Sequence, residues 1–252
     1  MLAAIKAEFR KMLTVRSLYI MLAFSLLMVG LFAFYGDGIK ASPASLNDTH
    51  KLAGDITNAI SALAVIGSLV GVLLMTHEYR YNTIMYTLTA SNSRLKTLLA
   101  KVFTVTVFIV CYTVLFATLS PLFAALGVQL HGGHLVAQDL LLSTVAWRVL
   151  LFGWVAAMLN LALAVIIRNQ IGTIVTMLLL PSTVEPLLSL VLKAKAAYLP
   201  YTVMHQIIDH NIIPEPSPHI AMSYGRAAVW GLGYVIVAWI IAAILFVRRD
   251  AN

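Results

Sequence analysis

Six long apolar stretches, separated by short polar segments, run along the chain. Each is close to the length of helix that crosses lipid, which takes about 20 residues. Lipid offers no partner for backbone N–H and C=O groups, so each stretch is expected to be helical. The predicted spans are 18–35, 56–75, 102–130, 149–167, 171–192 and 227–247. We therefore predict an all-α membrane protein with six transmembrane helices, forming a single transmembrane domain over 1–252.

The polar segments have patterns of their own. Residues 1–16 place apolar side chains at helical spacing with Lys6, Arg10 and Lys11 opposite them, which predicts an amphipathic elbow helix on the membrane surface. A simple basic flank would explain the charges but not the periodic apolar face. Residues 193–226 contain four prolines and are expected to form an outer loop with short helices.

Three further features lead to structural predictions. The polar stretch 37–55, which contains the glycosylation acceptor pattern Asn47-Asp48-Thr49, is expected to be an exposed loop. The third stretch is longer than a bilayer requires, so Pro121 is expected to end or kink it and let the remainder project or tilt outward. Gly67 and Gly71 form a small-xxx-small pattern that permits close helix contact without naming the partner helix.

Composition and charge fit this class. The chain is 61% hydrophobic and 11% charged, whereas soluble domains carry about 25% charged residues. If the N-terminus is cytoplasmic, eleven of the 17 Lys and Arg lie on the inner side. This bias predicts a multi-pass protein of the cell membrane with both termini in the cytoplasm. It also explains the net charge of +7, so no nucleic acid partner is expected.

Candidate chemistry is sparse. No nucleotide-binding loop is present, and no nucleophile motif groups Ser, His and Asp. The lone Cys111 is expected to pack within the third span. A metal site is not expected, because the histidines lack ligand spacing and a nearby acid. These are His131, His134, His205, His210 and His219.

Glu185 is the one acid expected inside a span. Its distance from Arg168 places it near the outer edge of the lipid core, which favours a water-exposed carboxylate. The alternative is an acid that lines the outer end of a translocation pathway.

The segment 76–101 is the most informative polar region. It carries cations, three tyrosines and a short apolar group formed by Ile84, Met85 and Leu88. Asn82 suits a tight bend, and the run that ends at Ser93 offers an N-cap for the next helix. A solvated loop would explain the cations but not the tyrosines and the apolar group. We therefore expect a helix–bend–helix projection that docks onto a soluble partner.

This segment resembles a known family, the permease subunits of ATP-binding-cassette exporters, in the second-type export permease family with the type V fold. That family shows an acid, a Gly-Thr pair, a short apolar turn, a Ser-Arg pair and an Ala-Lys pair that opens the next span. The corresponding residues here are Glu78, Asn82-Thr83, Thr87-Leu88-Thr89, Ser93-Arg94 and Ala100-Lys101, with Asn82 in the place of the glycine. The amphipathic start, Arg148, Tyr198-Leu199-Pro200 and the Arg248-Arg249-Asp250 tail are also similar.

The resemblance implies a mechanism. Two permeases, as a homodimer or a related heterodimer, would form the substrate pathway, and two cytoplasmic ATPase subunits would bind below them. ATP and Mg would sit on those partners, so no cofactor and no catalytic residue is expected on this chain. The segment 76–101 would hold the coupling helix. The contacts to the ATPase are expected from Glu8, Glu78, Arg80, Thr83, Ile84, Leu88 and Arg94.

Two other function classes stay open. A membrane module that captures substrate for an importer would hold ligand without its partner, although the long cytoplasmic projection argues against it. An intramembrane enzyme would need convergent polar residues within the spans, and the sequence offers almost none. The transported substrate is not identified, although sparse charge within the spans favours an amphipathic or apolar cargo.

Overall fold

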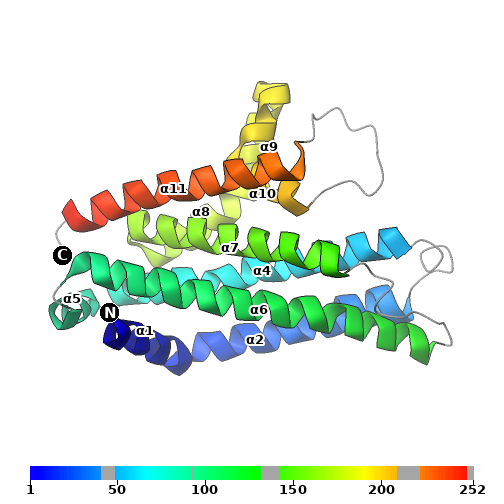
Figure 1. The fold of residues 1–252 in the computed structure, drawn as a ribbon, viewed down its shortest axis with the longest axis horizontal. Coiled ribbons are helices and arrows are strands. Elements are labelled where there is room, and N and C mark those ends of the chain that lie inside the picture. The colour runs from blue at the N-terminus through cyan, green and yellow to red at the C-terminus, as the bar shows by residue number, and fades with distance from the viewer. Residues whose placement is uncertain (41–48, 92, 132–141, 209–221, 249–252) are drawn as a thin grey trace.

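The computed structural model describes residues 1–40, 49–91, 93–131, 142–208 and 222–248, and every regular element in these ranges is a helix (Figure 1). Six of the helical stretches are long and apolar enough to cross a membrane. They are Arg16–Ile39, Gly54–Arg80, Arg94–Leu130, Ala146–Ile167, Gln170–Tyr198 and Tyr224–Arg248. The prediction of an all-α membrane protein with six spans is therefore confirmed.

In its described residues, the first half of the chain holds six elements. They are α1 (Leu2–Thr14), α2 (Arg16–Val29), the π-helix η1 (Gly30–Ile39), α4 (Thr49–Arg80), α5 (Ile84–Ser91) and α6 (Arg94–Leu130). The second half holds α7 (Leu142–Ile167), α8 (Gln170–Leu179), the π-helix η3 (Leu180–Val184), α9 (Glu185–Leu192), the 3₁₀-helix η4 (Lys193–Tyr198), α10 (Pro200–Ile208) and α11 (Tyr224–Arg248).

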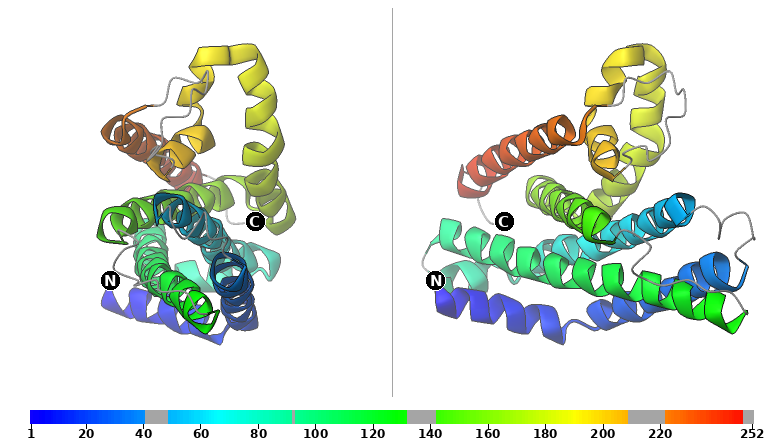
Figure 2. Two further views of the ribbon diagram at one scale, coloured as in Figure 1. Left: turned by 90° about the vertical axis from the view of Figure 1, so that its right-hand side faces the viewer. Right: turned by 45° about the vertical axis from the view of Figure 1, so that its right-hand side comes forward.

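The helices form a bundle with α4 and α7 at its centre. These two spans are the most buried, and they pack mainly on each other. The N-terminus, α5 and the C-terminal end of α11 lie at the same end of the bundle, which we call the α5 end (Figure 1). The opposite end is called the far end. The stretch from α8 to α9 leans away from the other helices, and little of it is buried by this chain (Figure 2).

Helices extend further at the far end than the sequence suggested. The expected loop over 37–55 is wrong at both edges, because η1 continues to Ile39 and α4 begins at Thr49. Asn47 and Asp48 lie outside the described residues. A close contact explains the extension of η1, since a Cβ atom on Gly38 would lie 2.8 Å from the Cα atom of Gly127 in α6. Glycine at both positions lets the two backbones meet, and this packing supports the last turns of η1.

Pro121 does not end the third span. Helix α6 continues past it to Leu130, so the expected end of the helix at this proline is wrong. Its last turns stay in the bundle, where Ala124, Gly127 and Val128 are buried and α6 packs on η1. This packing offsets the hydrogen bond that a proline nitrogen cannot make, which is why prolines are tolerated in membrane helices.

The small-xxx-small pattern of α4 faces α6. A Cβ atom on Gly67 would lie 2.7 Å from the ring of Tyr112, and one on Gly71 would lie 3.1 Å from Val105. Both neighbours belong to α6. The two glycines therefore let α6 lie directly against the central helix of the bundle.

Candidate functional site

A tight turn carries the chain from α4 into α5. Asn82 has a φ of 52°, in the left-handed region that favours glycine and then asparagine. The Thr83 N–H donates to the Glu78 carbonyl at 2.9 Å, and the Asn82 N–H donates to the Tyr79 carbonyl at 3.3 Å. This bond pair is the Schellman arrangement that closes a helix. The bend expected at Asn82 is confirmed, and it turns α5 back beneath the bundle.

Helix α5 has an inner and an outer side. Ile84 points inward and is 3% exposed, whereas Met85 is 51% exposed and Tyr86 is 77% exposed. Tyr81, in the turn before the helix, is also exposed. The apolar surface that α5 offers to another molecule is therefore made by Tyr81, Met85 and Tyr86, which we call the outer face of α5.

The next helix begins with the predicted cap. The Ser93 side chain accepts from the Lys96 backbone N–H at the start of α6. Arg94 follows, and its guanidinium donates to the carbonyls of Phe246 and Val247 at 3.4 and 3.1 Å. These carbonyls lie at the C-terminal end of α11, where a cation is favourable because unpaired carbonyls point outward. Arg94 thus ties the third span to the sixth.

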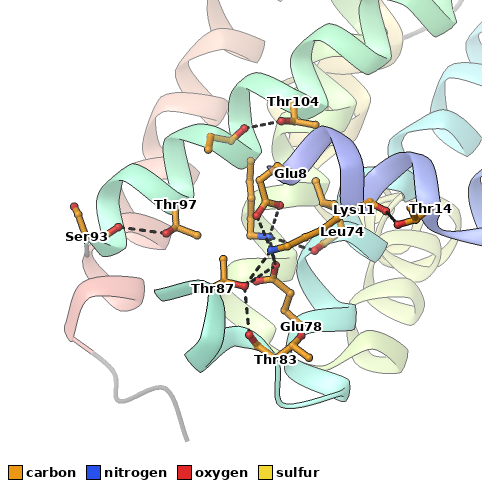
Figure 3. A network of polar contacts seen from close by, with 12 residues as sticks. Glu8, Lys11, Thr14, Leu74, Glu78, Thr83, Thr87, Ser93, Thr97 and Thr104 are labelled. Carbon is orange, nitrogen blue, oxygen red and sulfur yellow. Dashed lines mark hydrogen bonds and ion pairs between the residues drawn. The ribbon is translucent and has the colours of Figure 1, made fainter. Parts of the chain in front are cut away.

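Four charged side chains meet between α1, α4 and α6 (Figure 3). The Lys101 ammonium, fully buried, donates to one oxygen of Glu8 and one of Glu78, each at 2.8 Å. The Lys11 ammonium donates to the other oxygen of Glu8 at 2.8 Å and to the same oxygen of Glu78 at 2.7 Å. We call Glu8, Lys11, Glu78 and Lys101 the charge cluster. Its two cations and two anions balance, which is what burial of charge requires.

The charge cluster also reaches α5. The Lys11 ammonium donates to the Thr87 hydroxyl at 3.0 Å, and that hydroxyl donates to Glu78 at 3.3 Å (Figure 3). Thr87 belongs to α5, so a single hydrogen-bonded group links α1, α4, α5 and α6. A displacement of α5 would therefore be transmitted directly to the ends of two spans and to the N-terminal helix.

The surroundings of Glu8 and Lys11 favour the charged form of each. Burial favours the neutral form of Glu8, but Lys101 and Lys11 outweigh it and lower the pKa of Glu8 below its ordinary value of 4.5. Burial also favours neutral Lys11, but hydrogen bonds to Glu78 and Glu8 raise its pKa above 10.5. Both groups are charged at neutral pH.

A cavity of about 730 Å³ lies beside the charge cluster. Its walls come from α1, the α4–α5 turn, α5 and the start of α6, and include Ala4, Ala7, Thr83 and Tyr86. One oxygen of Glu78, Oε2, is buried here with no hydrogen-bond partner within the described part of the chain. The cavity therefore offers small apolar side chains to an incoming group, and an acceptor without a partner is buried close to it.

The predicted contact residues fall into four groups. Glu8 and Glu78 are brought together, but inside the charge cluster and not on the surface. Arg80 and Thr83 are exposed, and the Arg80 guanidinium donates to the Gln170 side chain at 3.1 Å. Ile84 and the half-buried Leu88 belong to the core, and Arg94 is bonded to α11. Sequence reasoning missed Lys11, Thr87 and Lys101 as members of the site. The spacing of three residues between Glu8 and Lys11 was a usable signal, because it places both on one helical face.

Glu185 is not the water-exposed carboxylate that its depth suggested. It is 5% exposed, and its oxygens accept from the backbone N–H groups of Tyr201 and Thr202 at 2.8 and 2.7 Å. The Thr202 hydroxyl donates to it at 2.8 Å. Glu185 therefore satisfies the free N–H groups at the start of α10, where a negative charge is stabilised.

A buried polar line continues from this capped helix into the bundle. The Tyr201 hydroxyl donates to the Asn160 side chain at 3.0 Å, and Asn160 donates to the Ser68 hydroxyl at 2.9 Å. These bonds connect α10 to α7 and α4. They satisfy polar groups that lipid could not satisfy, so they fix how α10 sits on the two central helices.

Two expectations concern groups outside this site. In the part of the chain that the structure describes, no three His, Cys, Asp or Glu side chains gather as metal ligands. His134, His210 and His219 lie outside the described residues, as do Arg249 and Asp250 of the tail. Cys111 is exposed on α6.

Comparison with known protein families gives one match relevant to this geometry. The model of the family described as "ABC-2 family transporter protein" matches residues 4–204. The matched region contains α1 from its third residue onward, all of α5 and the whole charge cluster. The comparison with curated proteins gives no match.

Proposed function

Because the chain belongs to the ABC-2 transporter family, whose members are transmembrane permeases, we propose that it is the membrane subunit of an ATP-driven exporter. Two copies, identical or related, form the substrate pathway. Two separate cytoplasmic ATPase subunits bind at the α5 end and hold ATP and Mg. The chain lies in the cell membrane with both termini in the cytoplasm, and it catalyses no reaction itself.

One observation carries the coupling part of this proposal. Helix α5 presents exposed Met85 and Tyr86 on one side and is fastened on the other side by buried Ile84 and by Thr87 in the charge cluster. A partner that binds the outer face of α5 and displaces this helix therefore also displaces α1, α4 and α6. Met and Tyr are also residue types that are enriched where proteins bind each other.

The cavity beside the charge cluster supports the same assignment. It opens at the α5 end between α1 and α5, next to the free oxygen of Glu78 and exposed Lys96. A loop or helix of the ATPase that enters it would contact the elbow helix and the coupling helix together. Thr83 lines this cavity and keeps its expected role in docking.

The fifth span supports the dimer. The stretch from α8 to α9 buries little of its surface against its own chain, and it exposes the hydroxyl-bearing Ser182 and Thr183 at mid-span. Exposed polar side chains at such depth face protein or a water-filled pathway more favourably than lipid. A second copy packed on this stretch would provide that environment. Glu185, two residues beyond Thr183 in the same stretch, keeps its possible pathway role as part of this proposal.

The coupling proposal is tested by changes on the outer face of α5. Met85→Asp or Tyr86→Asp places a charge in the proposed contact and leaves the core untouched. We expect each to weaken ATPase association at least about tenfold, since an unpaired charge buried in an interface costs more than 1.4 kcal/mol. Association is measured with purified permease in nanodiscs and the ATPase encoded with it. Leu130→Asp, an equally drastic change at the exposed far end of α6, is the matched control.

A variant at the buried Ile84 separates loss of folding from loss of the partner contact. Ile84→Asp buries a charge within the core of the chain and is expected to destabilise the folded permease, whereas Met85→Asp is not. Unchanged ATPase binding in both outer-face variants would overturn the coupling role of α5. Loss of binding in Leu130→Asp as well would show that the effect does not come from this surface.

A further inference from the structure

A second cavity, of about 300 Å³, lies near the far end, away from α5 and the charge cluster. It is enclosed by α2, η1, α4 and one residue of α6. Its walls are apolar and include Met28, Phe32, Leu63 and Ile66. We call it the far-end pocket. Its size lies at the lower limit of sites that hold small molecules.

The polar groups of this pocket are nearly all acceptors. Asp37 from η1 and Asp55 from α4 both border it, and they lie close enough for their charges to repel each other. No described residue forms a hydrogen bond or an ion pair with either carboxylate. Lys40 places its ammonium 5.0 Å from the centre of the Tyr35 ring, and it forms no ion pair with Asp37 or Asp55. Two like charges at the mouth of an apolar pocket favour a cation between them.

A third polar group is unused within the pocket. Ser120 of α6 also borders it, and its hydroxyl is completely buried without a hydrogen-bond partner among the described residues. Buried hydroxyls in native proteins are normally hydrogen-bonded, so this one leaves an unused polar group in the pocket wall. It is independent of the two carboxylates, since it comes from another helix.

The chemistry of the walls narrows the occupant. A small metal ion would need several oxygen ligands, and the pocket offers two carboxylates and one hydroxyl among apolar side chains. An anionic group would be repelled at the mouth. A molecule that is positively charged at one end and apolar at the other matches both the acidic mouth and the apolar walls. The wall also contains Phe32, and an aromatic ring attracts a cation over its face.

We propose that the far-end pocket binds an organic ammonium with an apolar body, with the ammonium between Asp37 and Asp55 and the body against α2 and α4. Such ligands have two sources, an amphipathic amine from solution or the headgroup of an amine-bearing lipid. The proposal goes beyond the exporter function, and its binding test needs neither the ATPase nor transport.

The test places a reporter thiol in the pocket. Ala59→Cys, in a Cys111→Ser background, adds a thiol to the α4 wall, and its reaction with neutral methyl methanethiosulfonate is followed in nanodiscs of phosphatidylglycerol. We expect hexyltrimethylammonium to slow this reaction and hexanesulfonate and hexanol to leave it unchanged. Leu126→Cys, on an exposed part of α6 outside the pocket, should not be protected by any of the three.

Charge variants give the second arm. The double variant Asp37→Asn, Asp55→Asn should raise the hexyltrimethylammonium concentration that gives half protection about tenfold. The reason is that it removes two partly exposed ion pairs to the ligand, each worth about 0.7 kcal/mol. Lys40→Gln removes a cation from the same end and should leave protection unchanged or tighten it. Equal protection by hexanesulfonate, or protection that survives the double Asn variant, would overturn the proposal.

The same assay distinguishes a lipid headgroup from a soluble amine as the natural ligand. If nanodiscs that contain phosphatidylethanolamine protect the thiol before any probe is added, the natural occupant is a lipid ammonium. If they do not, while hexyltrimethylammonium still protects, the occupant is a soluble amine. An absence of protection in both cases refutes the pocket as an ammonium site, and it does so without bearing on ATPase coupling.

Discussion

Removing the Lys101 ammonium is the sharpest test of the charge cluster. Lys101 is fully buried and is shared by Glu8 and Glu78, which are themselves only 2% and 6% exposed on their side chains. Lys101→Met keeps most of the volume of the side chain and removes only its charge. The variant leaves two buried carboxylates with one cation, Lys11, whose side chain is 39% exposed.

The expected cost follows from this imbalance. Breaking a buried ion pair by removing one partner costs about 3–5 kcal/mol, because the other charge stays buried without compensation. Adding Glu8→Gln restores a balanced pair of Lys11 and Glu78. The double variant should therefore recover stability, with a coupling free energy of at least about 1.5 kcal/mol between the two positions.

The assay is equilibrium unfolding in mixed micelles with increasing sodium dodecyl sulfate, followed by tryptophan fluorescence. Lys96→Met is the matched control, since Lys96 lies on the same helix but is exposed. If Lys101→Met lowers the free energy of unfolding no more than Lys96→Met does, the charge cluster does not hold α1 to the bundle. Additive costs in the double variant would likewise refute the compensation between Lys101 and Glu8.

Two further predictions concern single carboxylates. The lowered pKa of Glu8 means that its stabilising contribution is present in full above its unfolded value of 4.5 and is lost as pH falls through the folded pKa. The difference in unfolding free energy between the wild type and Glu8→Gln should thus stay constant from about pH 8 to pH 5 and shrink below that; a difference that already falls at neutral pH would contradict the cluster's electrostatics. Glu185→Gln keeps the shape of the α10 cap but removes its charge, and should cost about 1–2 kcal/mol in the same unfolding assay. An unchanged free energy of unfolding in this variant would show that the charge of the cap is dispensable.

The sequence by itself determined the class of the protein and the order of its spans. Lipid permits few backbone conformations, so length and hydropathy alone predict six helices. Turns and helix caps, which depend on only a few neighbouring residues, could also be predicted from the sequence. The bend at Asn82 and the Ser93 cap depend on the preferences of one residue and its near neighbours, and both occur as predicted.

Tertiary structure decided which side chains face each other. The pattern of α1 placed Lys11 opposite its apolar face, but contact with α4 and α6 turns it toward Glu78. Ile84 and Met85 are neighbours of equal apolarity, and only the packing of α5 on the bundle makes one core and the other surface. The helix also continues past Pro121 and into the 37–55 segment, since glycine contacts between η1 and α6 favour helix where local rules favour its end.

The physical reason is the distance along the chain over which each interaction acts. Propensity, capping and transfer into lipid are energies of a residue and its immediate surroundings, and a single sequence contains them. The partner of a buried charge is set by helices that lie far apart in the chain, such as Glu8 and Lys101. Desolvation makes such partners obligatory, but only the assembled bundle determines which of the available charges meets the requirement.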